Sequence, residues 1–207
     1  MSDSNAKQKK NVCVLLQNVR ISFPLLDEPH ASTAIPGAPE KYSASFLMEP
    51  GSPAHTACAK AIQEVAESAW GKAYAAKLAN PASDKQPLHR GDDRPKVYDG
   101  YAGMMYVSAS SRVQPDLRDA DPKIQIRDAQ AIREKFLPGY RVNAYVEFWP
   151  EMRFSQRVCA SLVGVQFAGY ADVLGGAAVQ ACDFPDVSAQ AAASASAFPA
   201  ADADIPF

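Results

Sequence analysis

The chain has 207 residues, and 47% of them are hydrophobic, which excludes a wholly disordered protein and allows one sizeable core. No apolar run approaches the ~18 residues that a membrane-spanning helix needs. The 21 basic and 23 acidic residues give a formal net charge of −2, which taken alone argues against a nucleic-acid partner.

The charges are divided unequally along the chain. All 21 basic residues lie at or before Arg157, and residues 1–171 contain 18 of the acidic ones, a net charge of +3. The other five acidic residues are aspartates between 172 and 204. A mildly basic body is therefore followed by a purely acidic tail, and this division is the first indication of function.

The N-terminal segment and the cysteines bear on the compartment. Residues 1–10 are polar and basic, and the apolar run after them is too short for a signal-peptide core, so we expect a flexible basic arm on a cytoplasmic protein. The cysteines are far apart and form no C-x-x-C pair, so we expect no zinc site, disulfide framework or other cofactor. They are Cys13, Cys58, Cys159 and Cys182.

The first predicted elements are strands with alternating apolar residues. The first covers 11–23, with Val19, Ile21 and Phe23 on its inner face, and Pro24 ends it. A loop over 24–40 and a second strand over 41–49 follow.

A long helix is predicted next. Ser52 is suited to the N-cap and Pro53 to the first helical position, and an Ala-rich stretch with apolar residues at helical spacing continues to about residue 79. Pro81 closes the helix, and a charged loop over 84–96 follows.

The strands in the second half alternate most clearly in 140–149, where Val142, Ala144, Val146 and Phe148 form the inward set. The other elements predicted there are a strand over 101–110, a loop over 114–122, a short helix over 128–136 and a strand over 158–167.

Five or six strands with one inserted long α-helix predict a mainly β fold, a small closed or partly closed barrel over residues 11–176. Ala, Ser and Gln with scattered Asp dominate 177–207, and we expect this tail to be disordered.

Enzyme motifs are absent from the sequence. It contains no phosphate-binding glycine loop, nucleophile elbow or zinc-protease helix. Asp92 and Asp93 beside His89 suggest a metal-dependent nuclease, but we interpret them as part of a solvated loop between prolines. We therefore expect no enzymatic activity.

The outward faces of the strands interleave cations with aromatic rings. This combination suits single-stranded nucleic acid, because cations neutralise phosphates and rings stack on bases whatever the sequence. Alternatively the aromatic residues pack under the long helix, against Trp70 and Tyr74. The candidate DNA-binding residues are Arg20, Lys41, Tyr106, Arg112, Arg141, Tyr145, Trp149 and Arg153.

The chain ends in an acidic peptide with a terminal aromatic ring. Such a peptide offers a ring and a carboxylate to an apolar pocket with a basic rim on a partner protein, and a flexible linker keeps it available. The candidate partner-binding residues are Asp202, Asp204, Ile205, Pro206 and Phe207.

Two resemblances follow from these motifs. The D-x-D-I-P-F ending is similar to the C-terminal tip of bacterial single-stranded-DNA-binding proteins, which captures replication and repair partners. The body resembles the tailed-phage OB-fold single-stranded-DNA-binding family, related to the T7-type protein. The resemblance covers roughly 12–176 and implies a five-stranded OB barrel with an inserted helix, binding single strands with little sequence preference. It is carried by VRISFP at 19–24, KYSASF at 41–46, AWGK at 69–72, YDGYAGMMY at 98–106, PGYRVNAYVEFW at 138–149 and SLVGVQF at 161–167.

The first hypothesis is therefore a protein that coats single-stranded DNA during phage-type replication and recombination and recruits partners through its tip. The alternatives are a factor that anneals complementary strands and, less favoured, a nuclease using Asp92 and Asp93. The oligomeric state does not follow from the sequence.

Overall fold

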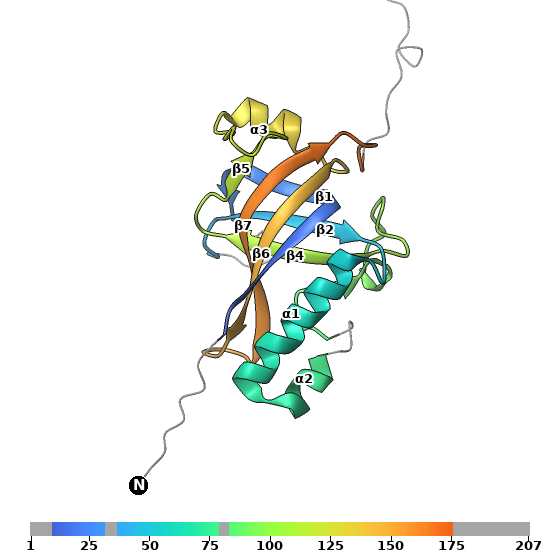
Figure 1. Cartoon of the computed structure of the whole chain (residues 1–207), viewed down its shortest axis with the longest axis vertical. Helices are drawn as coiled ribbons and strands as arrows, with labels where there is room; N and C mark the ends of the chain where they lie inside the picture. The colour runs from blue at the N-terminus through green and yellow to red at the C-terminus, as the bar shows by residue number, and fades with distance from the viewer. Residues whose placement is uncertain (1–9, 32–36, 79–82, 176–207) are drawn as a thin grey trace, which may run out of the picture. The chain divides into compact units, whose positions relative to one another are not determined.

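The computed structural model describes residues 10–31, 37–78 and 83–175, and within them one seven-stranded sheet is ordered β3-β4-β2-β1-β6-β7-β5. A parallel bridge between Ser110 and Ser161 joins β4 to β7 and closes five strands into a barrel (Figure 1). The predicted mainly β barrel of OB-fold type is thereby confirmed. The barrel strands are β1 (Val12–His30), β2 (Lys41–Met48), β4 (Met105–Ser111), β6 (Arg141–Glu151) and β7 (Arg157–Gly169).

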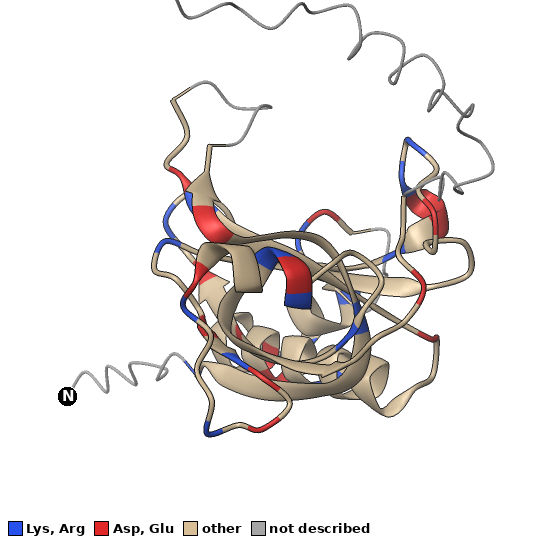
Figure 2. Ribbon diagram, turned by 90° about the horizontal axis from the view of Figure 1, so that it is seen from above, with Lys and Arg blue, Asp and Glu red and all other residues tan. Residues whose placement is uncertain are grey.

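The barrel core follows the predicted alternation in β6. Val142, Ala144, Val146 and Phe148 all have 0% exposure, so every second residue of this strand faces inward. Inward residues of β2, β4 and β7 complete the same cluster, which fixes which side chains remain on the outer faces. Figure 2 looks along the barrel and shows basic and acidic residues both spread around its ring.

Strand β1 differs from the prediction. It does not end at Pro24 but continues to His30, and its pairing with β2 shifts between Ser22 and Leu25. Phe23 lies in this bulge with a φ of 48° and is 46% exposed, so it does not share the inner face of Ile21 as the alternation predicts. A bulge also explains why Pro24 is tolerated, since one residue there needs no ladder hydrogen bond.

The long helix is interrupted once. Ser52 caps α1 (Pro53–Trp70) as predicted, but Gly71, with a φ of 88°, ends it and a second helix, α2 (Lys72–Leu78), follows. Both lie at one end of the barrel (Figure 1). Trp70 and Tyr74 pack against the core cluster, with their ring centroids 5.0 Å apart.

Two predicted loops contain short elements. The segment 84–96 holds β3 (Leu88–Arg90) and a 3-10 helix, η1 (Gly91–Asp93), and 114–122 holds β5 (Asp116–Arg118). The predicted strand over 101–110 begins only at Met105. The predicted short helix is present as α3 (Ala129–Lys135), capped by Asp128 and lying at the end of the barrel opposite α1 (Figure 1).

The remaining sequence predictions meet the structure only in part. Cys13, Cys58 and Cys159 are free thiols. Cys182, the arm over 1–9 and the tail with its tip lie outside the described residues. Within the described ranges, no helix is long and apolar enough to cross a membrane.

Candidate nucleic-acid interface

The outer face of β2 and β4 carries a floor of small hydroxyl side chains. Antiparallel pairing sets Ser43 opposite Ser110 and Ser45 opposite Ser108. The hydroxyls of Ser45 and Ser108 lie 2.8 Å apart and form a hydrogen bond with each other. Because these four outward side chains are small, the sheet surface here is lower than the segments that flank it.

A groove of about 650 Å³ runs over the β4 side of this floor, at Ser108 and Ser110. Its far wall comes from β6 and β7, where the indole N–H of Trp149 donates to the hydroxyl of Ser161 at 2.9 Å, which fixes the half-buried ring beside the floor. We call this groove the serine groove. Its central lining residues are Lys41, Ser108, Ser110, Arg112, Trp149, Arg157 and Ser161.

The serine groove is basic at its open side. Lys41, Arg112 and Arg157 are exposed, and none of them forms an ion pair with another residue of the described ranges. Glu151 also lines the groove, and hydrogen bonds from the backbone N–H groups that follow it hold the pKa of its carboxyl below its usual range. Three cations thus face two carboxylates, Glu151 and Asp84, and Arg157 lies opposite Glu151 in the pairing of β6 with β7.

The structure brings only some of the predicted DNA-binding residues to this groove. Lys41, Arg112 and Trp149 line it together, and Ser108 connects it to Tyr106 two residues earlier on β4. Arg157 lines it as well but was not among the sequence candidates, because the connection before β7 shows no alternation that would assign its face.

Arg20 and Arg141 lie elsewhere and are engaged in the fold. They face each other across β1 and β6 and line a separate cavity of about 750 Å³ beside the first turn of α1. Arg20 donates to the carbonyls of Gly139 at 3.1 Å and Asp172 at 2.7 Å, and Arg141 donates to the carbonyl of Asn18 at 3.1 Å. These bonds tie segments together that are distant in sequence.

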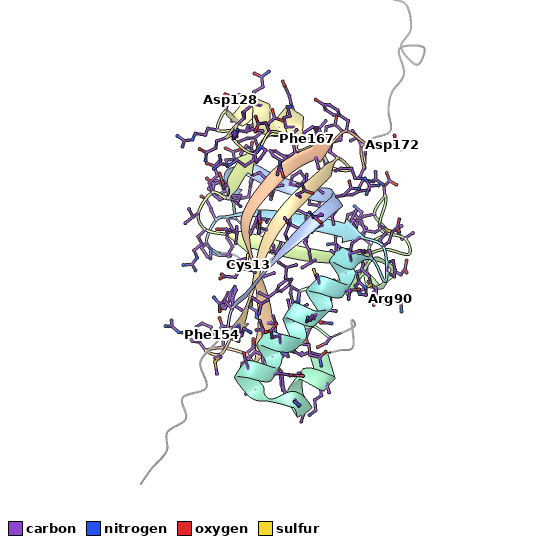
Figure 3. All side chains as sticks on the ribbon, in the orientation of Figure 1. Cys13, Arg90, Asp128, Phe154, Phe167 and Asp172 are labelled. Atoms are coloured by element: carbon purple, nitrogen blue, oxygen red, sulfur yellow. The ribbon has the colours of Figure 1, made fainter. Side chains whose placement is uncertain are left out.

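Two further candidates also lie outside the serine groove. Tyr145 is 50% exposed and pairs with Leu15 and Gly164, on the face formed by β1, β6 and β7. Arg153 is exposed in the β6–β7 hairpin beside Phe154, which is 92% exposed and lies at the hairpin end far from Phe167 (Figure 3).

Tyr106 belongs to an aromatic cluster at the edge of the serine floor. Its ring centroid lies 5.3 Å from that of Tyr101 and 5.6 Å from the His89 ring. The guanidinium of Arg94 lies 4.3 Å from the Tyr106 centroid, a cation–π contact. Sequence reasoning missed Arg94, since it treated the whole segment 84–96 as a solvated loop.

The acidic pair considered for a nuclease is part of the local structure. Asp92 accepts the backbone N–H of Gly103 at 2.9 Å and lies 3.9 Å from the Arg90 guanidinium. Gly91 packs so closely that an added Cβ would lie 1.9 Å from the Tyr101 carbonyl oxygen. In the described part of the chain, no group of three or more His, Cys, Asp or Glu side chains could hold a metal ion.

Comparisons with known proteins agree with this geometry. A family model described as Enterobacter phage Enc34, ssDNA-binding protein, matches residues 12–194. Protein p50 of Acyrthosiphon pisum secondary endosymbiont phage 1 is 34% identical over 182 residues, which are 84% of this chain and 94% of that protein.

Two solved single-stranded DNA-binding proteins share the fold of this chain. The single-stranded DNA-binding protein from bacteriophage Enc34 in complex with ssDNA superimposes with a TM-score of 0.60 at 25% identity, covering 78% of this chain and 88% of that one. The single-stranded DNA-binding protein gp2.5 of bacteriophage T7 shares the fold, with a TM-score of 0.51 at 13% identity over 86% of this chain and 96% of its own. The resemblance seen in the sequence is confirmed, and this chain belongs to the phage single-stranded-DNA-binding protein family represented by the Enc34 protein.

Proposed function

We propose that this protein binds single-stranded DNA in the serine groove with little sequence preference. The observation that carries the proposal is the groove itself, which joins a fixed indole ring, a hydroxyl floor and three exposed cations on one face of the barrel. The Enc34 relative, solved with single-stranded DNA, supports the same ligand.

Each part of the groove meets one part of a single strand. Lys41, Arg112 and Arg157 neutralise phosphates, and Trp149 stacks on a base, a contact worth about 1–3 kcal/mol. Serine hydroxyls both donate and accept, so they satisfy the edges of different bases equally well. Binding of this kind is tolerant of sequence.

The wider role follows from the tail. The protein coats exposed strands during phage-type replication and recombination in the host cytoplasm, without catalysing a reaction. The tip residues Asp202, Asp204, Ile205, Pro206 and Phe207 recruit partner proteins. Arg20, Arg141, Tyr145 and Arg153, which lie outside the groove, contribute less to the first contact with a short strand than the groove residues do.

A fluorescence titration tests the groove. Trp149 and Trp70 are the two tryptophans, so a Trp70→Phe protein reports on Trp149 alone. We expect an oligo-dT strand to quench this emission and Trp149→Leu to weaken binding about five- to a hundredfold. The matched control Tyr145→Leu removes an exposed ring that lies outside the groove, four residues earlier on β6, and should bind like the unmodified protein. Equal losses in both variants, or stronger binding to duplex than to single strands, would contradict the proposal.

A deletion of 198–207 tests the tip separately. The truncated protein should bind DNA as tightly as the full chain or more tightly, since acidic residues no longer compete for the cations, while it loses capture of replication proteins. A large loss of DNA affinity would contradict the assignment of DNA binding to the body and partner binding to the tip.

The nuclease alternative has its own test, in which labelled single strands are incubated with the full chain and Mg²⁺ or Mn²⁺. If the strands stay intact, the nuclease alternative is excluded.

A further inference from the structure

A second hollow continues the serine groove toward the aromatic cluster. It has a volume of about 280 Å³, with Phe23 and Arg94 on its walls and outward serines of β2 and β4 on its floor. It shares Ser108 and Ser110 with the serine groove, so a strand lying across the floor passes from one to the other.

Phe23 is held at this hollow by an unfavourable backbone conformation. Its φ of 48° lies in the left-handed region that residues with a bulky side chain rarely adopt. The bulge turns the ring out of the core to 46% exposure, where it meets Tyr98 edge to face at 5.0 Å and 83°. Backbone strain of this kind persists where the surroundings fix it, and it concentrates at ligand sites.

Arg94 forms the other wall and is held by rings instead of by a carboxylate. Its guanidinium lies 4.3–5.5 Å from the centroids of four rings, those of Phe23, Tyr98, Tyr101 and Tyr106. Among the described residues no acidic side chain forms an ion pair with it, so its charge stays available while its plane is fixed. An aromatic face and an available cation therefore border one hydroxyl-floored hollow.

We propose that this hollow is a second base-binding subsite, in which one base stacks on Phe23 while Arg94 contacts the adjoining phosphate. The inference rests on the proposed function and adds to it a second stacking position next to that of Trp149. The serine floor makes the subsite tolerant of the base, as it does in the groove. Successive nucleotides then occupy the Trp149 and Phe23 positions along one path.

The variants for this test keep either the backbone conformation at Phe23 or the positive charge at Arg94. Phe23→Asn removes the ring but suits the left-handed conformation, and Phe23→Tyr keeps the ring. Arg94→Lys keeps the charge but loses the planar guanidinium. We expect Phe23→Asn to weaken binding of oligo-dT and oligo-dC about five- to a hundredfold, Phe23→Tyr to restore it, and Arg94→Lys to weaken it with an unchanged salt dependence. Thermal melting confirms that each variant is folded.

A strand of abasic residues separates stacking from other effects. Without bases, the unmodified protein and Phe23→Asn should bind this strand equally. The subsite is overturned if the two proteins bind oligo-dT with equal affinity, or if Phe23→Asn loses as much affinity for the abasic strand as for oligo-dT. In either case the Trp149→Leu result still supports the groove. If the unmodified protein binds no single strand at all, the proposed function fails and the subsite fails with it.

Discussion

The salt dependence of DNA binding can be worked out from the cations that border the serine groove and the adjoining hollow. Lys41, Arg112 and Arg157 border the serine groove and Arg94 borders the adjoining hollow, which makes four candidates for phosphate contacts. Each phosphate neutralised on a single strand contributes about −0.7 to the slope of log K against log salt concentration, so we expect a slope of about −2.8. Raising the salt from about 50 to 200 mM should then lower the affinity about fiftyfold.

One substitution sharpens this prediction. Arg157→Gln removes one contact, so the slope should fall to about −2.1 and the loss over the same salt range to about twentyfold. Lys123→Gln is the matched control, since Lys123 is also exposed but lies between β5 and α3 and lines neither hollow. Fluorescence anisotropy of a labelled oligo-dT at four or more salt concentrations gives both slopes.

Two results would refute the reasoning. A slope shallower than about −1 in the unmodified protein would mean that phosphate contacts contribute little, and binding would have to rest on stacking alone. Identical slopes for Arg157→Gln and Lys123→Gln would mean that DNA does not follow the serine groove. A shallower slope only in Arg157→Gln supports the path.

Three further outcomes are expected. Phe148→Ala removes a ring with 0% exposure from the barrel core and should lower the free energy of unfolding by about 3–5 kcal/mol in a urea titration. Cys159 lines the serine groove, so bound oligo-dT should protect its thiol from iodoacetamide. Burial raises the pKa of the Cys58 thiol to about 12, so Cys58 should react only after unfolding. Mass spectrometry of the digested protein measures the labelling of each cysteine. Burial raises the pKa of Asp27, but the hydrogen bond from Arg133 at 2.5 Å and two backbone N–H groups outweigh it and hold the pKa below its usual range. The ion pair's stabilisation is thus present above about pH 4 and is lost as the pH falls through the lowered pKa, so the melting temperature of Asp27→Asn should fall less on acidification than that of the unmodified protein.

The barrel strands and their inward faces were predictable because both follow from the alternation of apolar residues along each strand. In β6 and β4 buried residues alternate with exposed or half-buried ones, and a strand with one buried face allows only one register. The cap of α1 was predictable for a similar reason, since the Ser52 side chain accepts the backbone N–H of His55, three residues away. Asp128 accepts the backbone N–H of Ala131 in the same way, although the prediction counted Asp128 as the first residue of the short helix. Local chemistry is sufficient for both features.

The placement of β1 was not predictable in the same way. Asn18 and Phe23 have φ values of 52° and 48°, and each coincides with a register shift that turns the following residues to the other face. Such bulges arise where a long strand must pair with β2 on one side and β6 on the other while the barrel closes. The requirement comes from the partner strands β2 and β6, and the alternation of 19–23 contains no sign of it.

The partners of the candidate DNA-binding cations were also not predictable from the sequence. In the sequence Arg20 and Lys41 are equivalent, because both are outward cations in alternating strands. In the structure Arg20 bonds to the carbonyls of Gly139 and Asp172, whereas Lys41 remains exposed at the serine groove. Carbonyl partners leave no pattern in side-chain composition, so only the folded chain separates a cation that holds the fold together from one that can meet a phosphate.

The small positive charge of the body therefore says little about its capacity for DNA. Arg118, Arg133 and Lys135 are paired with carboxylates, and Arg20 and Arg141 with backbone carbonyls, so these cations contribute to the total without offering a free contact. Lys41, Arg112 and Arg157 have no such partner among the described residues and lie at the serine groove, and Arg94 lies at the adjoining hollow. Since the acidic tail lowers the total without changing this face, affinity should depend on that local arrangement, and substitutions that keep the net charge but move a cation away from the serine groove should weaken binding.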